Sequence, residues 1–215
     1  MGLYNLKEHN EKVSFAQAVV KGIGKDQGLF FPDHIEPLAN VDELLDLPLV
    51  ERSQKILRHL IGDEIPELES IIADAFTFKA PIVKADENVY ALELFHGPTL
   101  AFKDFGARFM ARVLGSIRGD KHLTILTATS GDTGKAALQG FSDLNGIDIV
   151  VFYPKSGVSK IQELQMVTTP AKNTSVVAIK GNFDDAQTGV KELFNSKEFN
   201  AELKKAKNLL SKYQN

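Results

Sequence analysis

The 215-residue sequence contains no cysteine, which excludes disulfide bonds, thiolate metal sites and cysteine nucleophiles. It also lacks an excess of basic residues: the formal net charge is -3, so no overall positive field favours nucleic acid or anionic lipid. No apolar run approaches the roughly 18 residues that a membrane-spanning helix needs, and the N-terminus lacks a secretory apolar core. We therefore expect a soluble, cytoplasmic protein that binds neither nucleic acid nor membranes, and we assign no metal site.

The composition that remains is that of a globular protein, because 43% hydrophobic and 25% charged residues exclude disordered and collagen-like classes. Residues 1–80 have the pattern of short helices separated by glycine and proline. Ser14 and Gln17 form a capping-box pattern that opens one helix. Apolar residues recur at near-helical spacing from Val50 to Ile61 in another. We predict an N-terminal helical domain over residues 1–80.

From about residue 88, short apolar strand patterns alternate with helical patterns. The predicted strands cover residues 89–94, 123–128, 149–153 and 175–179. Such alternation is typical of right-handed βαβ units on a parallel sheet. We therefore predict an α/β fold, in which the helical N-terminal region is followed by an open, mostly parallel twisted sheet flanked by helices. The α/β domain is expected over residues 81–197, and a basic helix or tail over residues 198–215.

A first unusual loop runs from His96 to Gly106 and places Lys103 beside Phe102, at the start of a predicted helix. Apolar neighbours and the positive end of a helix both disfavour an ammonium group, which favours a neutral, nucleophilic amine. The same pattern also fits a lysine whose stem lies along apolar surface while its amine reaches water. Local spacing leaves both interpretations open.

A second unusual loop, from Thr127 to Gly134, lies between a predicted buried strand and a helix. Its glycines allow backbone N–H groups to approach an anion, and the helix N-terminus adds positive potential. The alternative is a simple turn in which Asp132 or Thr133 caps the helix. It is not a Walker loop, since Ala136 follows Gly134-Lys135 and Thr129 takes the place of the first glycine.

Considered together, the two loops carry a specific resemblance. Residues 95–104, FHGPTLAFKD, and residues 127–134, TATSGDTG, resemble the threonine synthases, within the tryptophan-synthase-β-like group of pyridoxal-phosphate enzymes. Residues 28–32, GLFFP, and residues 181–187, GNFDDAQ, are also similar to that family. The resemblance extends from the first residues to about Ser211.

The resemblance implies a lyase that converts O-phosphohomoserine to threonine and phosphate, with pyridoxal 5'-phosphate as its cofactor. Lys103 would hold the cofactor and move protons at the substrate α-carbon, beside Phe102 and Asp104. The α-carboxylate of the substrate would be bound by the loop that follows the strand and by His96. The loop residues concerned are Ser130, Gly131, Asp132, Thr133 and Gly134.

Members of this family are longer, and their second half is not represented in this sequence. We therefore expect this chain to be a truncated form that binds the cofactor weakly and turns over little by itself. Its exposed domain face would then be open to a complementing chain or to self-association. The alternative is a non-catalytic module, derived from the enzyme, that binds anions or a partner protein.

Overall fold

The computed structural model describes residues 2–199 and 201–202, and its first element is a small antiparallel sheet with the strand order β2-β1-β3. Leu3 pairs with Val13, and Tyr4 pairs with Phe31. The prediction of helices alone in this region was incomplete, because strands of two or three residues carry no alternating pattern to detect. Their bounds are β1 Leu3–Asn5, β2 Lys12–Val13 and β3 Phe30–Pro32.

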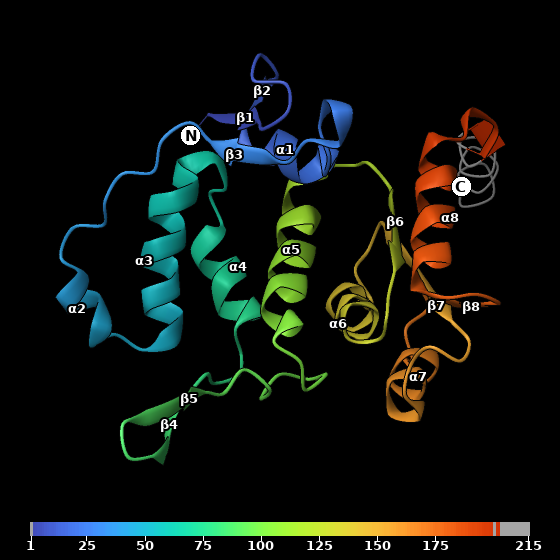
Figure 1. Ribbon diagram of the computed structural model, residues 1–215. Helices are drawn as coiled ribbons and strands as arrows, with labels where there is room; N and C mark the ends of the chain where they lie inside the picture. The colour runs from blue at the N-terminus through green and yellow to red at the C-terminus, as the bar shows by residue number, and fades with distance from the viewer. Residues whose placement is uncertain (1, 200, 203–215) are drawn as a thin grey trace.

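The helices predicted for this region are present and pack on one another. Ser14 Oγ accepts a hydrogen bond from Gln17 N, and Gln17 Oε1 accepts one from Ser14 N, so the capping box is confirmed. Helices α3, α4 and α5 lie side by side (Figure 1) around a core that includes Ile65, Leu68 and Ile72. The helices are α1 Phe15–Lys21, α2 Val41–Leu45, α3 Leu49–Ile61, α4 Leu68–Ala75 and α5 Lys103–Ile117, with short 3-10 turns at Lys25–Gln27 and Gly62–Glu64.

Strands β4 (Ile82–Asp86) and β5 (Val89–Leu92) form an antiparallel hairpin that projects from the molecule at the lower left of Figure 1. The sequence predicted the second of these strands but assigned it to the parallel sheet, which is wrong. The hairpin exposes large apolar side chains, with Ile82 70%, Tyr90 63% and Leu92 58% exposed. None of the described residues covers this apolar surface. Because isolated two-stranded hairpins are only marginally stable, a partner that packs on it would stabilise the hairpin.

Strands β6, β7 and β8 form a parallel sheet in that order, which confirms the predicted α/β class. Helix α6 covers one face and α8 the other (Figure 1). Because side chains alternate along a strand, Ile149 and Val151 are buried toward α6 and the main core, whereas Phe152 lines the α8 side. The elements are β6 Leu123–Ala128, α6 Asp132–Phe141, β7 Ile147–Pro154, α7 Lys160–Val167, β8 Thr174–Ile179 and α8 Phe183–Asn195.

Helix α5 joins the two parts, because it packs against α4 on one side and α6 on the other. The buried Arg108 guanidinium donates to the carbonyls of Ala75 at 2.8 Å and Asp74 at 2.9 Å, and to Gln139 Oε1 of α6 at 3.2 Å. None of the helices among the described residues is long and apolar enough to cross a membrane. Residues 203–215, most of the predicted basic tail, lie outside the described residues.

Candidate functional site

The two loops singled out in the sequence lead into the first turns of α5 and α6, two helices that pack together. Lys103 begins α5 and Asp132 begins α6. Helices α5 and α6 pack together, and Gln165 and Gln162 of α7 bond to the first and the second loop, so the fold brings the two loops to one place. The strand-end rule for α/β sheets predicts this meeting point only for the second loop, which follows β6.

The Lys103 amine is available for chemistry. Its Nζ lies 4.3 Å from the centroid of the Phe102 ring, and the side chain is partly buried. Phe102 itself is 58% exposed and forms an apolar wall next to the amine. Within the described part of the chain, no hydrogen bond or ion pair engages Nζ, so the amine is free to bond to a ligand.

The structure places Asp104 inside the fold, where it bonds to the loop that precedes α5. It is completely buried, and its carboxylate accepts hydrogen bonds from Thr99 N at 2.9 Å and Thr99 Oγ1 at 2.6 Å. Gly97 passes so close that a Cβ there would lie 2.4 Å from Asp104 Oδ2. The carboxylate therefore holds the loop that precedes Lys103. The nearby Phe105 ring packs on the Phe78 ring, with 4.6 Å between the ring centroids.

His96 is held by its own loop. Its Nε2 lies 2.7 Å from Glu93 Oε2, and its ring lies 4.7 Å from the Phe95 ring, centroid to centroid. Among residues 2–199 and 201–202, no hydrogen bond joins His96 to the 130–134 loop. The bond to the Glu93 carboxylate fixes the orientation of the His96 ring.

The second loop is built around Thr129, a residue that the sequence analysis did not single out as a site residue. Thr129 is 1% exposed, and its Oγ1 accepts hydrogen bonds from Gly131 N at 2.9 Å and Gly134 N at 2.8 Å. The N–H groups of both glycines are therefore not free for an anion. The sequence could have predicted this role, because a hydroxyl stands two residues before a Gly-x-x-Gly segment. Serine and threonine hydroxyls bond readily to nearby backbone N–H groups.

The donors that remain open belong to the first turn of α6. The backbone N–H groups of Asp132 and Thr133 have no acceptor among the described residues, as expected at the start of a helix. The hydroxyl-bearing residues Ser130 and Thr133 are exposed beside them. Of the predicted cradle, these three residues present donors, whereas Gly131 and Gly134 provide space and shape.

A compact polar network surrounds the Asp132 carboxylate. Gln162 Nε2 of α7 donates to Asp132 Oδ1 at 3.0 Å, and the buried Lys135 ammonium lies 3.0 Å from the same oxygen. The hydrogen bond from Gln162 and then that from Lys135 lower the pKa of Asp132, with a weaker contribution from Lys103. The Asp132 carboxylate is therefore held by Gln162 and Lys135, and Lys103 adds a weaker electrostatic contribution.

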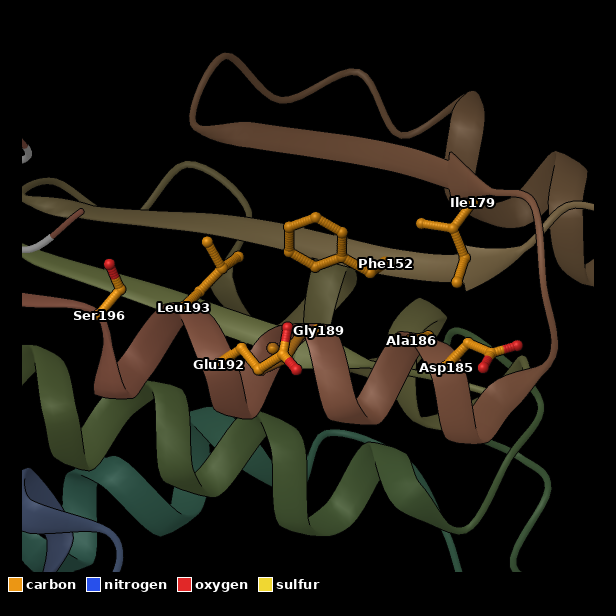
Figure 2. A pocket seen from close by; sticks show the side chains of 9 residues that line it. Phe152, Ile179, Asp185, Ala186, Gly189, Glu192, Leu193 and Ser196 are labelled. Carbon is orange, nitrogen blue, oxygen red and sulfur yellow. The ribbon is translucent and has the colours of Figure 1, made fainter. Parts of the chain in front are cut away.

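A separate cavity of about 380 Å³ lies between α8 and the sheet, which contributes Phe152 and Ile179 to its lining (Figure 2). Its charged lining residues, Asp185 and Glu192, are both acidic, so it does not suit a carboxylate or a phosphate. Within the described residues, no group of three or more histidine, aspartate or glutamate side chains could hold a metal ion.

The comparisons with known proteins identify the family of the chain. Residues 76–203 match the model of the pyridoxal-phosphate dependent enzymes, and residues 5–76 match that of the threonine synthase N terminus. The chain belongs to the pyridoxal-phosphate dependent enzyme family. The threonine synthase of Haemophilus influenzae is 55% identical over 200 residues, covering 92% of this chain and 47% of the relative. That of Escherichia coli is 52% identical over 207 residues, covering 94% and 48%.

Solved structures extend the likeness to three dimensions. The crystal structure of the Escherichia coli threonine synthase has a TM-score of 0.86 at 52% identity, covering 94% of this chain and 48% of that one. A pyridoxal-phosphate-bound threonine synthase from Brucella melitensis has a TM-score of 0.83 at 35% identity, covering 93% and 45%. The resemblance read from the two loops is therefore confirmed, and this chain spans about half the length of the threonine synthases it matches.

The residues present fit the family's cofactor at its reactive end. Pyridoxal phosphate carries an aldehyde, and the primary amine of a lysine is the group that condenses with an aldehyde. Lys103 is such an amine, and the exposed Phe102 ring beside it offers an apolar face to a flat ligand. The fit therefore rests on Lys103 and Phe102.

Proposed function

We propose that this chain contributes the lysine and carboxylate-binding parts of a threonine synthase site that converts O-phosphohomoserine to threonine and phosphate. The single observation that carries the proposal is the packing of α5, which begins with the unpaired Lys103 amine, against α6, whose first turn carries open N–H donors. The 55% identity with a threonine synthase supports the choice of reaction.

In this proposal Lys103 Nζ holds the cofactor and afterwards moves a proton at the substrate α-carbon. Phe102 shields one side of the amine, and Asp104 holds the loop that places it. Pyridoxal phosphate, when bound, supplies a conjugated ring that accepts electrons. Overall, the Cγ–O bond to phosphate and one Cβ–H bond break, water gives its hydroxyl to Cβ, and a proton bonds to Cγ. The phosphate leaves with the second proton of the water.

The substrate α-carboxylate is assigned to the second loop. The N–H groups of Asp132 and Thr133 and the hydroxyl of Ser130 are the donors, while Gly131 and Gly134 leave room for the side chains of Gln162 and Thr129. A carboxylate at the N-terminus of α6 also gains from the helix dipole. His96, fixed by Glu93, lies at the edge of this site in the proposal.

We further propose that turnover needs more polypeptide than this chain provides. The chain spans 47% of its Haemophilus influenzae relative, and a site open to water loses much of the fixed electrostatic environment that accelerates such reactions. The apolar β4–β5 hairpin is the surface where a complementing chain, or a second copy, would dock. The threonine synthases' remaining part is the partner we favour.

The decisive experiment traps the cofactor on the chain. Treatment with pyridoxal phosphate and borohydride, followed by digestion and mass spectrometry, should give a pyridoxyl adduct on Lys103. The Lys103→Ala variant should lose this adduct, whereas Lys79→Ala, which removes an exposed lysine, should retain it. Labelling scattered over many lysines would contradict the assigned site and favour the alternative, a non-catalytic anion-binding module.

A second measurement tests the docking proposal. Phosphate release from O-phosphohomoserine is measured for the chain alone and after addition of the remaining part of the Escherichia coli relative. We expect little release from the chain alone and a clear increase in the mixture. Replacing Tyr90 and Leu92 of the hairpin with serine should reduce that increase, and an unchanged increase would exclude the hairpin as the docking surface.

A further inference from the structure

Helix α7 lies against both loops of the site, and two of its glutamines reach one loop each. Gln162 Nε2 donates to Asp132 Oδ1 at 3.0 Å, and Gln165 Nε2 donates to the carbonyl of Thr99 at 3.5 Å. Residues three apart on a helix share one face. One surface of α7 therefore contacts both the anion loop (residues 127–134) and the lysine loop (residues 96–106).

Gln162 uses its amide twice. Its Oε1 accepts a hydrogen bond from Ser159 N at 3.0 Å, which caps α7, and its Nε2 bonds to Asp132. The amide also fills the space beside Gly131, where a Cβ would lie 2.4 Å from Gln162 Cδ. Gly131 has a φ of 133°, which only glycine adopts readily, so the loop backbone runs directly against this amide.

The bond to Asp132 matters because an acidic side chain stands in a loop that has to receive an anion. A short carboxylate at the start of a helix readily accepts bonds from nearby backbone N–H groups. Released from its present partners, the Asp132 carboxylate could bond to the same N–H groups that a ligand needs, and it would repel that ligand. The amide of Gln162 and the ammonium of Lys135 instead hold Oδ1.

We propose that Gln162 is a positioning residue, which holds the Asp132 carboxylate away from the open N–H groups of Asp132 and Thr133 and so sets the loop's affinity for a carboxylate ligand. This inference rests on the proposed function, because it deepens the role given there to the 130–134 loop. Gln162 contacts no ligand in this scheme and acts through Asp132.

The sequence provides a matched control. Gln17 holds the same position in the capping box of α1, with Ser14 as its partner, as Gln162 does with Ser159 in α7. Glutamate serves equally well at this position of a capping box. Gln162→Glu and Gln17→Glu therefore both preserve a helix cap, and only Gln162→Glu replaces the donor to Asp132 with a second carboxylate.

The readout is binding of L-threonine to the 215-residue chain without cofactor, followed through the backbone amide NMR shifts of residues 132 and 133. L-threonine amide, which lacks the carboxylate, is the ligand control. We expect Gln162→Glu to weaken binding by about tenfold, the effect of losing one hydrogen bond to a charged group, and Gln17→Glu to change it by less than about twofold. Equal affinity in wild type and Gln162→Glu would overturn the proposal, as would wild-type amides that do not respond to L-threonine.

An exchange of partners separates positioning from helix capping. In the double variant Asp132→Asn with Gln162→Glu, net charge is kept and the bond returns with donor and acceptor exchanged, so affinity should recover to within about threefold of wild type. A loss as large as in Gln162→Glu alone would overturn the proposal.

Two further arms keep the test decisive. If Gln162→Glu does not fold, the test uses Gln162→Met, which is neutral and similar in length. Gln17→Met is then the control, and the same affinity criteria apply. Failure of the proposed function is recognised separately, by the absence of the pyridoxyl adduct on Lys103 in the wild-type chain.

Discussion

The side chain of Thr129 offers a quantitative test of how the anion loop is built. Its Oγ1 accepts hydrogen bonds from the N–H groups of Gly131 and Gly134, and its methyl group packs so closely that a Cβ on Gly134 would lie 2.4 Å from Cγ2. Thr129→Val keeps the shape of the side chain but removes the oxygen. The substitution therefore leaves two buried backbone donors without their acceptor.

The expected cost follows from those two bonds. An unpaired buried donor costs about 1–3 kcal/mol, so Thr129→Val should lower the free energy of unfolding by about 2–4 kcal/mol. Thr129→Ser keeps the oxygen and loses one methyl group, which costs about 1 kcal/mol. The order of stability should therefore be wild type, then serine, then valine, whereas hydrophobicity alone would place valine first at a buried position.

The assay is urea unfolding followed by circular dichroism and by tyrosine fluorescence. With a denaturant slope of about 2–3 kcal/mol per molar, the valine variant should unfold at about 1 M less urea than wild type. A valine variant at least as stable as the serine variant would refute the role given to Thr129.

Three further outcomes follow from other buried or paired groups. Asp104→Ala should lower the free energy of unfolding by about 2–4 kcal/mol in urea unfolding, because Thr99 loses two acceptors. Arg108→Met should cost about 2–3 kcal/mol in the same assay, since buried carbonyls of α4 lose their donor. Hydrogen bonds from Lys21, from Asn5 and from the N–H of Lys25 lower the pKa of Glu11 to about 2. The stability of wild type over Glu11→Gln should therefore be complete above pH 4.5 and be lost as the pH falls through 2. The measurement is the melting temperature of both proteins against pH.

Each of these outcomes has a clear opposite. An Asp104→Ala variant with wild-type stability would mean that Thr99 finds other acceptors. An Arg108→Met variant that is more stable than wild type would show that removing the buried charge outweighs the lost bonds. For Glu11, a difference between wild type and Glu11→Gln that does not change between pH 5 and pH 2 would contradict the lowered pKa.

Local signals in the sequence predicted the helix starts and the sheet strands well. The two Ser-x-x-Gln boxes mark the starts of α1 and α7, because a cap involves residues only three apart. The apolar runs at β6, β7 and β8 were recognised because buried parallel strands are apolar on both faces. The same signals missed the pairing of β1 with β3, which joins segments far apart in the chain, and the β4 strand, whose residues are all exposed.

The sequence by itself determined the α/β class, the two loops to which we assign the chemistry and, through their resemblance, the cofactor family. Only the tertiary structure decided which atoms in those loops are free: Asp104 is committed to Thr99, the glycine N–H groups to Thr129, and the Asp132 carboxylate to Lys135 and to Gln162, 30 residues further along the chain. The physical reason is that a loop pattern shows which donors and acceptors exist, whereas packing decides which of them are already paired and which remain for a ligand.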